Sequence, residues 1–462
     1  MLINFGTNYS KCNIMFDVNG NYTINNANMR ITSLNNWNGR VAFPNGIQKP
    51  SIEVYGYTND TGVNAFNSKV EFPDTVTDLS NCFYRRTRFN KNVVIPNSVT
   101  NVSNMFSVSG FNQNINIPDS LTNTAYMFYF ASSFNQNVQI PNGVINASGM
   151  FGRTMLNQNI QIPNSVTDTS HMFEDCSSIF QNIQIPNSVT NVSSMFASSS
   201  CTQNIQIPNS VTDVTAMFSN TLLFNQNIKI PNSVTLASYM FNSCSSFNQN
   251  IQIPNSVTKV AGMFNNCPIF NQNIQIPNSV DNAAFMFSNC RNLNQNIQIP
   301  NSLTALVGTF NSCRNLNQNI QIPDGVTNML NTFRDCRNLN QNIQIPDGVT
   351  NMQSTFDCCI SLNQNIQIPN SVINMSFVFN NCTNLSNITV LPKKRSALNT
   401  NSIIRNNATY SINIWTDSAT AINIMNAGFI QGNKKPTMET IDNGYYNALY
   451  NVYIYTNAVF PS

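Results

Sequence analysis

The sequence predicts a repeat solenoid, a continuous right-handed coil with short parallel β-strands and little helix, and three observations support this. Prolines recur every 22 or 23 residues along most of the 462-residue chain. A phenylalanine stands ten residues after the proline in all fourteen intervals. Isoleucines alternate with polar residues just before most of these prolines. Units this similar must stack, because one unit cannot bury its own apolar face. The prolines are Pro73, Pro96, Pro118, Pro141, Pro163, Pro186, Pro208, Pro231, Pro254, Pro277, Pro300, Pro323, Pro346, Pro369 and Pro392.

The coil from Asn294 to Leu316, NQNIQIPNSLTALVGTFNSCRNL, illustrates one unit. Ile297 and Ile299 alternate with polar neighbours, which predicts a short strand with both isoleucines pointing inward. Pro300 removes a backbone donor and ends this strand. The phenylalanine and cysteine that follow return the chain to the core. Each strand should therefore pair in parallel with the strands of the adjacent coils.

The motif Met-Phe-x-x-Cys-x-x-Phe-Asn-Gln, as in residues 240–249, lies in a longer pattern, Ile-x-Ile-Pro-x-Ser-Val-Thr-x-Val-x-x-Met-Phe-x-x-Cys. This pattern resembles the BspA-type leucine-rich repeat of microbial surface proteins, and the shorter motif is similar to a related repeat of bacterial and mycoplasma surface proteins. The spacing before the isoleucines is one residue longer than in that family. The resemblance covers about 320 residues. It implies a leucine-rich-repeat-like solenoid used for attachment or interaction, and not an enzyme.

The repeat divides the chain into three parts. Residues 71–392 form the predicted solenoid of about fourteen coils of 22 or 23 residues. Residues 1–70 are expected to be an N-terminal cap or docking segment, in which Trp37 and Phe43-Pro44-Asn45-Gly46 suggest a degenerate first coil. Residues 393–462 follow Lys393-Lys394-Arg395 and are expected to be a β-rich C-terminal cap or docking domain. Its two alternating segments, 411–415 and 451–455, predict strands.

Composition excludes several classes of protein. Charged residues make up 9% of the chain, against about 25% in an ordinary soluble protein. The net charge of +3 does not indicate a nucleic-acid partner. No apolar stretch is long enough for a membrane-spanning helix, and the first residues do not resemble a secretory signal peptide. We expect no cofactor, because there is neither a phosphate-binding loop nor a dinucleotide-binding motif.

Eight of the twelve cysteines stand ten residues before a proline of the repeat. Equivalent side chains of stacked coils point in the same direction, which disfavours disulfides between them. We therefore expect a column of buried free thiols that act as small apolar groups. The spacings do not fit a zinc site. The eight are Cys176, Cys244, Cys267, Cys290, Cys313, Cys336, Cys359 and Cys382.

A column of glutamines stands two residues before the prolines and is expected to be exposed. Two interpretations stay open for it. A uniform column is typical of a structural amide ladder, whereas a repetitive ligand such as a polysaccharide could be met by repeated amides. The central members are Gln252, Gln275, Gln298, Gln321 and Gln344.

Charged side chains offer little chemistry. The single histidine, His171, is expected to be an exposed substitution, and Asp175, Asp335 and Asp357 are expected to be solvated. Four arginines lie close together in adjacent coils. They could form a solvated face, with their charge compensated by Asp335 or by acids in the next coils such as Asp324 and Asp347. They could also contact an anionic partner, either a carboxylate- or phosphate-bearing glycan or an acidic patch on a neighbouring subunit. These arginines are Arg291, Arg314, Arg334 and Arg337.

Two functional hypotheses follow, and a third is weaker. The first is a structural or attachment protein of a bacteriophage particle, assembled in the host cytoplasm and therefore needing no signal peptide. The second is a microbial cell-surface adhesin that binds host protein or glycan. The third places an enzyme on the end segments. Expected partners are other virion or surface proteins and a cell-surface glycan, with no nucleic acid.

Overall fold

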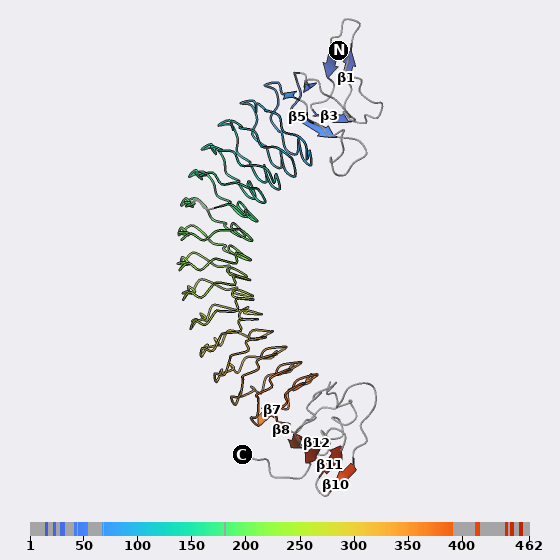
Figure 1. Cartoon of the computed structure of the whole chain (residues 1–462), viewed down its shortest axis with the longest axis vertical. Coiled ribbons are helices and arrows are strands. Elements are labelled where there is room, and N and C mark those ends of the chain that lie inside the picture. The colour runs from blue at the N-terminus through green and yellow to red at the C-terminus, as the bar shows by residue number, and fades with distance from the viewer. Residues whose placement is uncertain are drawn as a thin grey trace. The chain divides into compact units, whose positions relative to one another are not determined.

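The computed structural model describes residues 69–390 apart from 180–181, residues 41–53 apart from 44, residue 67, and short strands nearer the two ends. The chain divides into two compact units, Met1–Phe224 and Asn225–Ser462. In each unit successive coils of the repeat stack on one another (Figure 1). The predicted solenoid is confirmed, and the described residues contain no helix.

Strands gather at the two ends of the repeat. In the first unit β1 (Ile14–Phe16) pairs antiparallel with β2 (Tyr22–Ile24), while β3 (Asn28–Thr32) pairs parallel with β5 (Lys49–Glu53), and β4 (Val41–Ala42) with β6 (Val70–Glu71). The second unit ends in one six-stranded sheet of order β10-β11-β12-β9-β8-β7. Its members are β7 (Ile366–Ile368), β8 (Asn387–Val390), β9 (Ile412–Trp415), β10 (Glu439–Ile441), β11 (Gly444–Asn447) and β12 (Val452–Tyr455).

Coils are joined mainly through the turn segment that follows each proline. In the coil of Pro300, the backbone N–H groups of residues 306, 308, 310 and 312 donate to carbonyls of the next coil. The N–H groups of residues 309, 311 and 313 donate three residues back within their own coil. The same alternation recurs from coil to coil. A single parallel bridge, five residues after the proline, precedes the segment in most described coils.

This alternation requires positive φ at two positions of every coil, eight and twelve residues after the proline. They include Gly308 (φ 58) and Ser312 (φ 59), and the other coils place Asn, Ser, Ala and even aromatic residues there. Positive φ is typical of the third residue of a type II turn and is unfavourable for most side chains. The inter-coil hydrogen bonds therefore hold the backbone in this conformation against its local preference.

The predicted strand before each proline is wrong for most coils. Ile297 is buried and Gln298 exposed, as expected, but the segment is not a strand. Within the described coils such pairing occurs only near the two ends, between β4 and β6 and between β7 and β8. The alternating burial results from the inward isoleucines and does not require backbone pairing. Backbone pairing between coils is instead concentrated in the turn segment.

Apolar side chains form continuous columns inside the stack. The phenylalanines ten residues after each proline are fully buried, and their rings stack at 5.6–5.8 Å along the second unit, as for Phe287 and Phe310. A second buried column, Phe or Leu in most coils, closes each coil, and the ring of its member Phe247 lies 4.2 Å from that of Phe241 between centroids. Burying such rings contributes roughly 2–3 kcal/mol each.

The thiol column is confirmed. All eleven cysteines within the described residues are free, and the eight members of the column are buried. Cys290 Sγ donates to the carbonyl oxygen of Phe264 at 3.0 Å, and other members repeat this bond to the preceding coil. The thiol thus satisfies a buried carbonyl of the preceding coil, as does Thr221, which replaces it in one coil and donates to Phe196 O at 2.8 Å.

The segment 41–53 occupies the place of a coil before the first repeat. Thr77 N donates to Gln48 O, as Thr100 N does to Thr77 O one coil later. Lys49 Nζ lies 2.7 Å from Asp78 Oδ2. The interpretation of Phe43 and its neighbours as a degenerate first coil is confirmed by these bonds. Trp37 and residues 393–395 lie outside the described residues.

The C-terminal segment continues the parallel stack and then changes direction. The strands predicted at 411–415 and 451–455 are confirmed as β9 and β12. β7, β8, β9 and β12 pair in parallel, whereas β11 pairs antiparallel with β12 and β10 antiparallel with β11. A cap or docking role for residues 1–70 and 393–462 stays a prediction.

We expect the buried thiols to make the protein sensitive to alkali. Burial raises the pKa of Cys176 to about 11 and those of Cys201 and Cys267 to about 12, from 9.0. The contribution of each thiol to stability is complete below pH 9, where the thiol is protonated in both the folded and the unfolded state. It is lost as the pH rises toward 12. Each thiol should lower the free energy of unfolding by about 1.4 kcal/mol per pH unit in that window.

Urea unfolding between pH 8 and pH 11 measures this loss. A variant with Cys267, Cys290, Cys313 and Cys336 replaced by serine should lose stability less steeply above pH 9. Equal slopes for the two proteins would contradict a buried, protonated column.

We also predict that glycine is required beside an exposed aromatic ring. Gly308 has φ 58, and a Cβ atom there would overlap the ring of Phe285 in the preceding coil. Gly308→Ala should therefore cost about 2 kcal/mol or more, from positive φ and the ring clash together. In a Phe285→Asn background only the backbone part, about 1 kcal/mol, should remain. Thermal unfolding of the four proteins tests this, and equal costs in both backgrounds would show that the ring plays no part.

Candidate functional site: an exposed amide face

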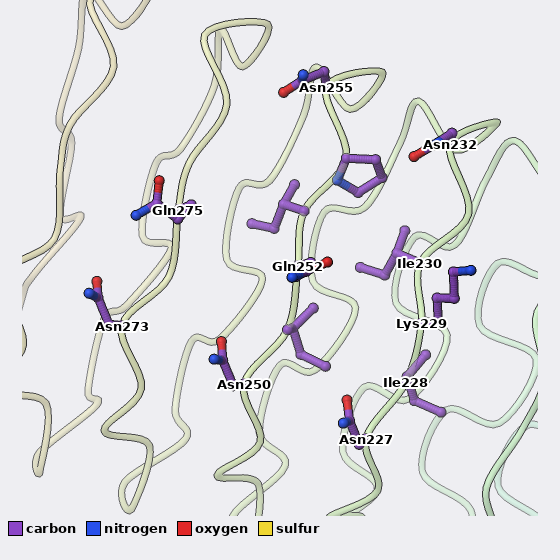
Figure 2. Close-up of a pocket in the computed structure, with 13 residues that line it drawn as sticks. Asn227, Ile228, Lys229, Ile230, Asn232, Asn250, Gln252, Asn255, Asn273 and Gln275 are labelled. Carbon is purple, nitrogen blue, oxygen red and sulfur yellow. The ribbon is translucent and has the colours of Figure 1, made fainter.

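Amide side chains line one face of the second unit in regular rows. In each coil an exposed Asn and an exposed Gln alternate with two inward isoleucines, as in Asn250 and Gln252. Figure 2 shows the equivalent residues of three successive coils, with Asn227, Asn250 and Asn273 in one row. Lys229 takes the place of the glutamine in the first of these coils. The predicted glutamine column, Gln252, Gln275, Gln298, Gln321 and Gln344, is exposed throughout.

The face is hollowed between neighbouring coils. A depression of about 900 Å³ lies among the segments around Lys229, Gln252 and Gln275. A second depression of about 410 Å³ lies beside it, around Gln275 and Gln298. The residues that line the two depressions are Asn, Gln, Ile, Pro and one lysine, with no carboxylate among them. The surface therefore offers amide donors and acceptors over a partly apolar floor.

The glutamines of this face do not form the expected structural ladder. Gln298 Nε2 lies 3.4 Å from Asn296 Oδ1 of its own coil, and no hydrogen bond joins the column's glutamines across the described coils. A different pair of amides forms the ladder. Asn248 Oδ1 accepts from Asn271 N at 2.9 Å and from Gln272 Nε2 at 3.0 Å. This bond pattern repeats along each unit, so the exposed glutamines are left to solvent or to a ligand.

Three of the four predicted arginines lie close to acids, and one of these two acids is an expected one. Arg314 Nε lies 3.0 Å from Asp335 Oδ2, and Arg337 Nε lies 2.7 Å from Asp335 Oδ1. Arg334 Nε lies 3.1 Å from Asp357 Oδ2. Asp335 compensates as expected, while Asp357 takes the place expected of Asp324 and Asp347. Arg291 donates to Asn289 at 2.9 Å.

Two of the three aspartates expected to be solvated are not. The side chain of Asp357 is 8% exposed and that of Asp335 is 17% exposed, because both accept from arginines of neighbouring coils. Asp175 is exposed, as predicted. His171 is half-exposed and forms a hydrogen bond with Glu174, at 2.9 Å between Nδ1 and Oε2. Contact of the arginines with an anionic partner stays a prediction.

The described residues contain no group of three or more potential metal ligands. Nor does this part of the chain include a helix long and apolar enough to cross a membrane.

Sequence reasoning missed a group of aromatic residues on the turn segment. Tyr126, Tyr129 and Phe130 belong to one coil, and the next coil has Gly149 and Gly152 at the positions of the two tyrosines. Tyr239 is likewise followed by Gly262, and Phe285 by Gly308. Comparing equivalent positions in successive coils would have revealed this alternation of ring and glycine.

Matches to one family model cover most of the chain. The model is described as Mycoplasma protein of unknown function, DUF285, and it matches residues 58–162, 119–210, 141–229, 190–301 and 304–416. The chain belongs to this family. No curated protein is significantly similar to it.

Solved structures with the same kind of repeat are similar to the chain. A leucine-rich repeat protein from Bacteroides ovatus has 19% identity and a TM-score of 0.52, covering 88% of this chain and 99% of its own. A leucine rich cell surface protein from Faecalibacterium prausnitzii has 22% identity and a TM-score of 0.36, covering 83% of this DUF285 chain and 94% of its own. The first likeness confirms the predicted leucine-rich-repeat fold.

We predict that the arginines of this DUF285 protein differ in their structural importance. Arg334→Gln removes a partner of the buried Asp357 carboxylate and should cost about 1–3 kcal/mol. Arg291→Gln removes only an exposed bond to Asn289 and should change stability by less than about 0.5 kcal/mol. Chemical unfolding of the two variants measures the difference, and equal losses would contradict the role assigned to Asp357.

Proposed function

We propose that this protein is a non-enzymatic attachment protein of a microbial cell surface, whose amide face binds an extended polysaccharide. The observation that carries the proposal is the row of exposed amides that the fold itself does not use. The ladder of the other Asn and Gln residues already joins the coils through bonds such as Asn294 N to Asn271 Oδ1. The outer glutamines therefore have no structural task that would explain their repetition.

A repetitive ligand fits this surface better than a small molecule. A site for one small ligand gathers varied polar groups around one point, whereas Gln252, Gln275 and Gln298 offer the same group at successive coils. Amides both donate and accept, as sugar hydroxyls do. Many weak contacts along one chain add up through their local concentration. Lys229 adds a single cation, which favours a polysaccharide that carries carboxylates.

The bacteriophage-particle hypothesis has less support. The family description refers to Mycoplasma proteins, and the similar structures are described as bacterial leucine-rich repeat proteins, one of them from a cell surface. None of these descriptions mentions a virion. We therefore favour the adhesin, and we favour a non-enzymatic role because none of these descriptions mentions a catalytic activity.

A triple variant tests the proposal. Gln252→Ala, Gln275→Ala and Gln298→Ala together should weaken binding to immobilised polysaccharides at least tenfold without changing the melting temperature. The probes are hyaluronan and chondroitin sulfate, which carry carboxylates, and dextran, which is neutral. We expect the intact protein to bind at least one of the first two.

A matched control removes three exposed amides from another part of the second unit, Asn292, Asn315 and Asn338. Their replacement by alanine should leave binding unchanged. Failure of the intact protein to bind any of the three polysaccharides, or equal binding by both triple variants, would refute the role of the amide face.

A further inference from the structure

One coil of the first unit departs from the repeat in a way that its fold does not require. Tyr126 and Phe130 occupy the two positive-φ positions of this coil, with φ of 57 and 60. The preceding coil has Asn104 and Val108 there. The inter-coil hydrogen bonds impose positive φ at these two positions in every coil, but they do not call for bulky rings there, which are unfavourable at positive φ.

The next coil provides space for these rings. A Cβ atom on Gly149 would overlap the ring of Tyr126, and one on Gly152 would lie 2.8 Å from the ring of Tyr129. The rings of Tyr126 and Tyr129 pack edge to face, with centroids 5.4 Å apart. The tyrosines thus rest against bare backbone and are held in position. Phe130 beside them is 43% exposed.

Charged groups from the following coils surround the three rings. The guanidinium carbon of Arg153 lies 5.8 Å from the ring centre of Tyr129 and 5.4 Å from that of Phe130. Arg153 Nε also lies 3.7 Å from Asp175 Oδ2. The hydrogen bond with His171 holds the pKa of Glu174 below its ordinary value, so Glu174 is an acceptor at neutral pH.

We propose that these residues form a binding site for a short neutral oligosaccharide, with Tyr126, Tyr129 and Phe130 as the platform and Arg153, His171 and Glu174 as its polar rim. The negative faces of aromatic rings attract the C–H groups on one side of a sugar. Planar charged groups at the rim can bind neighbouring hydroxyls in pairs.

The charges of the site favour a neutral ligand over the alternatives. A cationic ligand would compete with Arg153, which already lies over two of the rings. An anionic ligand would be repelled by Glu174 and Asp175 beside that arginine. A purely apolar peptide would leave the rim groups without partners, which is unfavourable. The site is independent of the amide face, since it uses other residues of the coil.

The test replaces each aromatic residue by the residue at its position in the preceding coil: Tyr126→Asn, Tyr129→Ser and Phe130→Val. The triple variant should keep a melting temperature close to that of the intact protein, because the preceding coil holds these residues at the same positions. Binding is measured by saturation-transfer NMR and calorimetry with methyl glycosides of glucose, galactose, mannose and N-acetylglucosamine and with their short oligomers.

We expect the intact protein to bind at least one of these ligands and the triple variant to bind it at least tenfold more weakly. Tyr239→Asn is the matched control, since Tyr239 also lies against a glycine but lacks the charged rim. It should bind like the intact protein, as should the Gln252, Gln275 and Gln298 variant. No binding by the intact protein, unchanged binding by the triple variant, or preference for a lysine-rich peptide would overturn the proposal.

Discussion

The hydrogen bonds between the turn segments of successive coils are the constraint on which the rest of the structure depends. They fix two positive-φ residues in every coil and thereby the spacing of the buried columns on either side. The additional residue of the 23-residue coils lies outside this segment. In the coil of Pro96 one residue separates Ser109 from the closing Phe111, whereas in the coil of Pro73 two residues separate the equivalent Arg86 from Phe89. Length therefore varies only outside the turn segment, next to the closing residue of the coil.

The solenoid and its core could be predicted from the sequence, because the same buried positions recur in every coil and give the sequence a regular period. The phenylalanine and cysteine columns followed directly from that period. The strand assignment did not, because inward isoleucines such as Ile297 alternate with polar residues whether or not the backbone pairs. Periodicity reports the side of the chain that is buried and not the hydrogen bonds that it makes.

The site was only partly predictable for a related reason. Both Gln249 and Gln252 recur in every coil of this region, and the period cannot show which of them bonds to the neighbouring coil. Only the geometry separates the ladder glutamine from the exposed one. The buried environment of Asp357 was hidden in the same way, since its partner Arg334 lies 23 residues away in sequence.

The two proposed surfaces differ in whether their residues recur from coil to coil. The amide face is uniform and suits a ligand that is itself repetitive, whereas the aromatic platform occurs in a single coil and suits a ligand with one defined shape. Both are made of side chains that the inter-coil bonds leave unused. A rigid stack in which one part of each coil carries the hydrogen bonds leaves other parts open to recognition.

Hydrogen exchange of individual backbone amides tests this division most directly. The account predicts strong protection at Leu306, Gly308 and Phe310, whose N–H groups donate to the next coil. It predicts much faster exchange at Gln298 and Ile299, which are not in a strand although Ile297 is buried beside them. Equal protection of the two segments would mean that a continuous β-sheet runs beneath the amide face, and would contradict the account.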